Sequence, residues 1–86
     1  MGEEASRVPS KEEIDEESKR VRRLRIVVSL ALSIIAQGEM PLEEAQDLAA
    51  AARRVALTLF PGKGDVYDLI YRPKFQQLIN EVYRLQ

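Results

Sequence analysis

The chain has 86 residues and a mass of 9.8 kDa, which leaves room for one small domain. Its 45% hydrophobic and 31% charged residues are typical of a globular protein, and the absence of cysteine, histidine and tryptophan excludes disulfides, thiolate or imidazole metal sites and histidine acid-base catalysis. The net charge of -1 predicts no long-range attraction of the whole protein to nucleic acid or membranes. We therefore expect no enzyme, no cofactor and no small-molecule substrate.

Residues 1–9 have no periodic pattern and are predicted to form a disordered tail ahead of one helical domain over residues 10–86. Ser10 and Glu13 have the spacing of a capping box, which predicts that a long helix begins at Ser10. Gly38 can adopt the left-handed conformation that ends a helix, so this helix is expected to end at Gln37. At 1.5 Å per residue it is roughly 40 Å long.

An apolar stripe follows one side of this first helix. Its members, spaced by seven, three or four residues, are Ile14, Val21, Leu24, Val28, Ala31 and Ile35. In the upstream half the other sides are charged, whereas in the downstream half they carry further apolar residues, namely Ile26, Val27, Leu30 and Ile34. The downstream half is therefore predicted to be covered on most sides, and the upstream half on one side only.

Two opposed charge blocks lie on the upstream half. Five of residues 11–17 are acidic, and five of residues 19–25 are basic: Lys19, Arg20, Arg22, Arg23 and Arg25. The basic run is a candidate contact for phosphates of nucleic acid or of anionic lipids. The other interpretation is a self-neutralised surface, because Asp15, Glu16 and Glu17 lie three or four residues before Lys19 or Arg20, which is the spacing of helical ion pairs.

The segment 26–38 is uncharged but shorter than the about 20 residues that a membrane span needs. Together with the preceding basic run it also resembles a signal peptide, which would leave a secreted or periplasmic domain beginning near Glu39. Seven acidic residues within the first 25 disfavour this alternative. We therefore expect a cytoplasmic protein.

A second helix is predicted over residues 41–59. Pro41 is suited to a first helical position, and the residues of the expected core face are mostly small: Leu42, Ala45, Ala49, Ala52, Ala56 and Leu59. Small side chains allow close approach, so this helix is expected to pack tightly and antiparallel against the downstream half of the first.

Two shorter helices are predicted to follow. Residues 60–64 form a turn by composition, and their resemblance to a phosphate-binding loop fails on spacing. Asp65 is expected to cap a helix over residues 66–71, with Asp68 at the capping-box position. Pro73 is expected to begin the last helix, on which residues 74, 77, 80 or 81, and 84 form a polar face that loosely suggests DNA recognition. Its apolar side includes Phe75; with Tyr67, Tyr71 and Tyr83 this residue forms either part of the core or an exposed aromatic patch.

These elements predict a small all-α bundle. At roughly 40 Å the first helix is longer than the second, at about 28 Å, so Ile14, Val21 and Leu24 are expected to extend beyond the cover that the second helix provides. With Val28 they form the predicted interface for a second copy or another protein. The leading hypothesis is accordingly a non-enzymatic interaction or adaptor module that self-associates. The alternative is a nucleic-acid accessory protein that uses Lys19 to Arg25.

Overall fold

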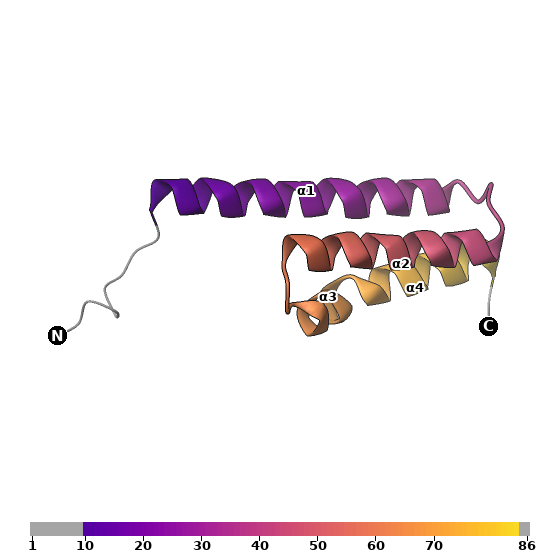
Figure 1. Ribbon diagram of the computed structural model, residues 1–86. Helices are drawn as coiled ribbons and strands as arrows, with labels where there is room; N and C mark the ends of the chain where they lie inside the picture. Colours follow the sequence, from indigo (N-terminus) through magenta and orange to yellow (C-terminus); the bar gives the residue numbers. More distant parts are fainter. Residues whose placement is uncertain (1–9, 85–86) are drawn as a thin grey trace.

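The computed structural model describes residues 10–84, which form four helices and no strand (Figure 1). The helices are α1 (Lys11–Ala36), α2 (Leu42–Leu59), α3 (Gly64–Ile70) and α4 (Arg72–Tyr83). The predicted all-α fold is confirmed, with helix boundaries close to those expected. The tail predicted for residues 1–9 lies outside the described residues.

The two ends of α1 follow from the sequence signals that predict them. At its start the Glu13 amide donates to the Ser10 hydroxyl at 3.1 Å, and the Ser10 amide donates to the Glu13 carboxylate at 3.2 Å. This is the reciprocal capping box. At its end Gly38 has a φ of 67°, and its amide donates to the Ile35 carbonyl at 3.0 Å. The chain then turns into α2.

Three of the four helices, α1, α2 and α4, pack side by side. α2 runs antiparallel along the downstream half of α1, and α4 returns beside α2 (Figure 1). α1, α2 and α4 contact one another, whereas α3 packs on α2 and α4 and does not contact α1. The Tyr83 hydroxyl donates a hydrogen bond to the Met40 carbonyl, which ties the end of α4 to the turn between α1 and α2.

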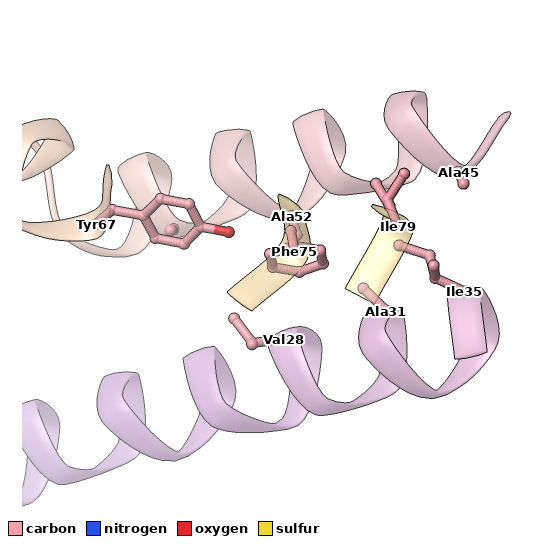
Figure 2. Close-up of a cluster of buried hydrophobic side chains, with 9 residues drawn as sticks. Val28, Ala31, Ile35, Ala45, Ala52, Tyr67, Phe75 and Ile79 are labelled. Atoms are coloured by element: carbon pink, nitrogen blue, oxygen red, sulfur yellow. The ribbon is translucent and has the colours of Figure 1, made fainter. Parts of the chain in front are cut away.

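The core lies where these helices meet (Figure 2). Its nine buried residues are Val28, Ala31, Ile35, Ala45, Ala52, Ala56, Tyr67, Phe75 and Ile79. Every core residue from α2 is alanine, as the small-residue pattern predicts, and such side chains let α2 approach its neighbours closely. Ile35 is fully buried and is the largest such side chain.

The prediction that the downstream half of α1 is covered on most sides is wrong. Ile26 and Leu30 are 58% and 59% exposed. Both lie roughly 140–180° around the helix from the core residues Val28 and Ile35, at about 100° per residue. α2 and α4 pack on the core side of α1, so the opposite side faces solvent.

The predicted start of α3 also needs correction. The helix begins at Gly64, and Asp65 does not cap it, because the capping position is Lys63 and no side chain bonds the first amides. Asp68 forms no capping box either and pairs instead with Arg53 of α2. Pro73 lies in the first turn of α4, as predicted.

Candidate interaction surfaces

The four residues of the predicted partner interface do not form one accessible surface. Ile14 is 49% exposed and Val21 is half-buried, but Leu24 packs against the core and Val28 is 4% exposed. α2 reaches further along α1 than predicted: the Arg20 guanidinium carbon lies 5.9 Å from the centroid of the Phe60 ring that follows α2. The uncovered arm of α1 is therefore short, residues 11–19, and Val28 is unavailable to any partner in the folded chain.

The basic run is mostly solvent-exposed. Of the predicted ion pairs only Glu17 with Arg20 forms within residues 10–84, at 3.3 Å. Arg22, Arg23 and Arg25 are exposed and make no ion pair with the described residues. Lys19 is likewise exposed and makes no ion pair with the described residues, so the structure supports neutralisation for Arg20 alone, and four cations of the run stay available to an anionic partner.

The side of α1 opposite the core combines these cations with apolar side chains. We call it the outer face, and it consists of Lys19, Arg22, Arg23, Ile26, Leu30 and Ser33. Its downstream part contains a shallow depression of about 430 Å³, which Ile26 and Leu30 line together with arginine and serine side chains. The outer face is therefore basic upstream and apolar downstream, and it can accept another apolar surface.

Sequence reasoning missed the exposure of this face, although a signal was present. The chain contains one other long helix, and its packing side is mostly alanine. Two neighbouring helices cover one side of a third and cannot enclose it. Apolar residues around most of the circumference of the downstream half of α1 therefore exceed what the chain can bury by itself.

A second apolar surface lies on α3. Val66 and Ile70 are about half exposed, and Leu69 is 79% exposed, the highest value among the large hydrophobic residues that the structure describes. Positions three and four apart share one face of a helix, so these three residues lie together. Since α3 does not contact α1, this surface is separate from the outer face.

A groove between α2 and α4 was not predicted. It has a volume of about 810 Å³, with Ala49, Ala50, Phe75 and Ile79 along its apolar part. At one end Arg53 donates two hydrogen bonds to Asp68, at 2.8 and 3.0 Å. These bonds lower the pKa of Asp68 and raise that of Arg53, so both groups stay charged. The pair links α2 to α3 and fixes that end of the groove.

The aromatic residues near the C-terminus belong to the core rather than to an exposed patch. Tyr67 and Phe75 are buried, and the Tyr67 and Tyr71 ring centroids are 5.2 Å apart. Figure 2 shows the Tyr67 side chain reaching toward Phe75 and Ala52. Its hydroxyl is buried without a hydrogen-bond partner among the described residues, and burial raises its pKa.

Some polar side chains of α4 make contacts with other residues of the same chain. The Gln77 amide donates to Glu81 at 3.1 Å, and Lys74 lies 5.6 Å from the centroid of the Tyr71 ring. Asn80, which the sequence places on or beside the polar face, is exposed and lines the groove together with Gln76. Residues 60–63 form the turn before α3; the predicted turn included Gly64, which is instead the first residue of α3.

Within residues 10–84 no three potential metal-ligating side chains cluster. Among the helices of that part of the chain, none carries an apolar stretch of the length that a bilayer requires. No family of known proteins matches the sequence, and neither the curated proteins nor the solved structures contain a match to it.

Proposed function

We propose that this protein is a non-enzymatic helical interaction module of the cytoplasm that associates with itself. The observation that carries the proposal is the exposure of Ile26 and Leu30 on the outer face, at 58% and 59%. Large apolar side chains that lie together on a surface mark an interaction site more often than isolated ones do. Self-association would remove both side chains from water in each copy.

The outer face supports this proposal better than the arm does. Within the arm Ile14 is the single large apolar residue, and Glu17 follows it on the same stripe. On the outer face the two exposed side chains are one helical turn apart and border the half-buried Val27 and Ile34. The apolar surface is thus larger and continuous there.

The α3 surface extends the proposal from self-association to an adaptor. Val66, Leu69 and Ile70 are exposed on a helix that makes no contact with α1. A protein bound to α3 would therefore not compete with a second copy bound to the outer face. The two surfaces together suit a module that pairs and also recruits another protein.

Light scattering over a concentration series tests the self-association. The expected mass rises from 9.8 kDa toward twice that value as concentration increases. Leu30→Glu should keep the chain monomeric, because it places a charge in the apolar contact. Leu69→Glu makes the same change on α3 and should leave the dimer intact. A mass of 9.8 kDa at every concentration, or dimerisation that Leu30→Glu does not affect, would contradict the proposal.

One observation favours a second candidate function, binding to nucleic acid. Arg22, Arg23 and Arg25 are exposed and make no ion pair within residues 10–84. Each cation that neutralises a phosphate releases counterions, so binding should weaken steeply with salt. Arg22→Glu with Arg23→Glu should abolish it, whereas Arg54→Glu, an exposed site on α2, should change it little. Failure to retard DNA or RNA at low salt would remove this candidate.

A further inference from the structure

We infer that two copies of this chain pair through their outer faces with the α1 helices antiparallel. The two-fold axis crosses the outer face at the level of residue 28 along the helix, on the side of α1 opposite the Val28 side chain. The inference rests on the proposed self-association and adds the orientation and the register. It starts from the spacing of positions 23, 26, 30, 33 and 37, which alternates between three and four residues. This is the spacing of a seam between two packed helices.

The axis position follows from the exposed apolar residues. In an antiparallel pair, residues at equal distances from the axis lie opposite each other. An axis beside position 28 therefore places Ile26 of one copy against Leu30 of the other, twice by symmetry. Among the ways of aligning the two seams, this register covers the exposed side chains of both Ile26 and Leu30 with apolar atoms of the second copy. It also places Arg23 opposite Ser33.

The charges of the outer face select the antiparallel orientation. A parallel pair in register would place Arg22 and Arg23 beside their own copies, and like charges repel. The antiparallel pair instead brings them toward the C-terminal end of the second α1. That end carries the negative pole of the helix dipole, has no basic residue in its last turn, and is followed by Glu39. Each copy would supply the cation that the other helix end lacks.

The side chains beside the seam fit the same arrangement. On one side lie Val27 and Ile34, which are half-buried in the single chain and add apolar area. On the other lies Ser29, whose small side chain allows the helices to approach closely. Two large apolar residues per copy make a small interface, below the roughly 1,200 Å² of stable assemblies. The dimer is therefore expected to be weak.

Cysteine cross-linking tests the orientation without background, because the chain contains no cysteine. Both suitable positions, Arg23 and Ser33, are exposed. Chains with Arg23→Cys are mixed with chains carrying Ser33→Cys, oxidised, and analysed by mass spectrometry, which separates mixed from self-linked products. The mixed disulfide should form at least about tenfold faster than either self-linked product. Ser33→Cys mixed with Arg54→Cys, on α2, measures random collisions.

The possible results distinguish a wrong antiparallel register from a failure of self-association itself. If light scattering shows a dimer but Arg23→Cys chains link to themselves as fast as to Ser33→Cys chains, the antiparallel register is wrong and self-association stands. If the chain is monomeric at every concentration, both fail. Monomers that float with vesicles of anionic phospholipid would assign the outer face to a membrane surface, and that result would also overturn the pairing.

Discussion

Two tyrosine hydroxyls in this protein differ in their hydrogen bonding. The Tyr83 hydroxyl donates to the Met40 carbonyl, whereas the Tyr67 hydroxyl is buried without a partner among residues 10–84. A buried polar group without a hydrogen bond lowers stability by about 1–3 kcal/mol, and a satisfied one contributes about 1 kcal/mol. Equivalent substitutions at the two sites are therefore expected to act in opposite directions.

Tyr67→Phe is expected to raise the free energy of unfolding by about 1 kcal/mol, because it removes the hydroxyl and keeps the ring. Tyr83→Phe, the matched control, should lower it by about 1 kcal/mol, because the Met40 carbonyl loses its donor. Urea denaturation followed by circular dichroism measures both. A loss of stability in Tyr67→Phe would show that its hydroxyl is hydrogen-bonded in solution.

The Arg53–Asp68 pair is expected to make stability depend on pH in the acid range. Its hydrogen bonds hold the pKa of Asp68 below the usual value of 3.8, so the unfolded chain takes up a proton first as the pH falls. The stabilisation is thus present above about pH 4 and is lost as the pH falls through the folded-state pKa.

Asp68→Asn should therefore unfold at lower urea than the wild type at pH 7, with the difference shrinking toward about pH 2. Glu17→Gln, which removes the exposed ion pair at the edge of the arm, should change the midpoint little at either pH. An equal loss for Asp68→Asn at both pH values would assign its role to packing instead of charge.

Among the elements, the two glycine turns differ in what surrounds them. Gly38 and Gly62 both have positive φ angles, 67° and 78°. A Cβ added at Gly38 would lie 3.2 Å from Cγ1 of Val82, whereas one added at Gly62 would meet no atom within 4 Å. Gly38 therefore serves both the turn after α1 and the contact with α4.

Gly62→Ala is expected to lower the free energy of unfolding by about 1 kcal/mol, the penalty for the left-handed conformation. Gly38→Ala should lower it further, because it adds the crowding against Val82. Combining Gly38→Ala with Val82→Ala should remove that extra loss relative to Val82→Ala alone. Urea midpoints measure the series, and equal losses for the two glycine variants would contradict a role in the α4 contact.

The sequence was sufficient to predict those features of the fold that depend on residues close together in the chain. The Ser10–Glu13 capping box, the helix-ending Gly38 and the alanine periodicity of α2 each act within a few residues, and the structure confirms them. Asp68 shows where local rules fail, because Arg53, fifteen residues away, binds the carboxylate that the capping rule assigns to the helix start. Local spacing cannot reveal a competitor supplied by another helix.

The candidate surface was harder to predict than the fold for a similar reason. Which side of α1 is covered depends on where α2 and α4 both pack, and this is a property of the whole arrangement. Ile26 and Ile35 have the same hydrophobicity, yet one is exposed and the other fully buried. Periodicity identified both as apolar and could not distinguish them.

At the scale of the whole molecule the described residues form an elongated body (Figure 1). Much of the length comes from α1, whose N-terminal part extends beyond α2 (Figure 1). The described arm residues before Arg20 are all exposed, whereas Val28, Ala31 and Ile35 are buried. One helix therefore spans regions of different local stability.

Hydrogen exchange of the dilute protein should show this gradient. Amides of residues 15–19 are expected to exchange much faster than those of residues 28–35, because opening the arm exposes little buried surface. Amides in the middle of α2 provide the reference for core protection. Uniform protection along α1 would show that the arm is covered in solution.

The Tyr83–Met40 hydrogen bond has a consequence for how the chain folds. It joins residues 43 positions apart, the largest separation among the side-chain hydrogen bonds of residues 10–84. α2 and α3 pack mainly on sequence neighbours, and such local contacts form quickly, whereas α4 also packs on the distant α1. The bond between Tyr83 and Met40 closes the whole loop that these helices make, so it requires them to be in place first. We expect it to form late, which makes residue 83 a position where substitution speeds unfolding and leaves the folding rate nearly unchanged.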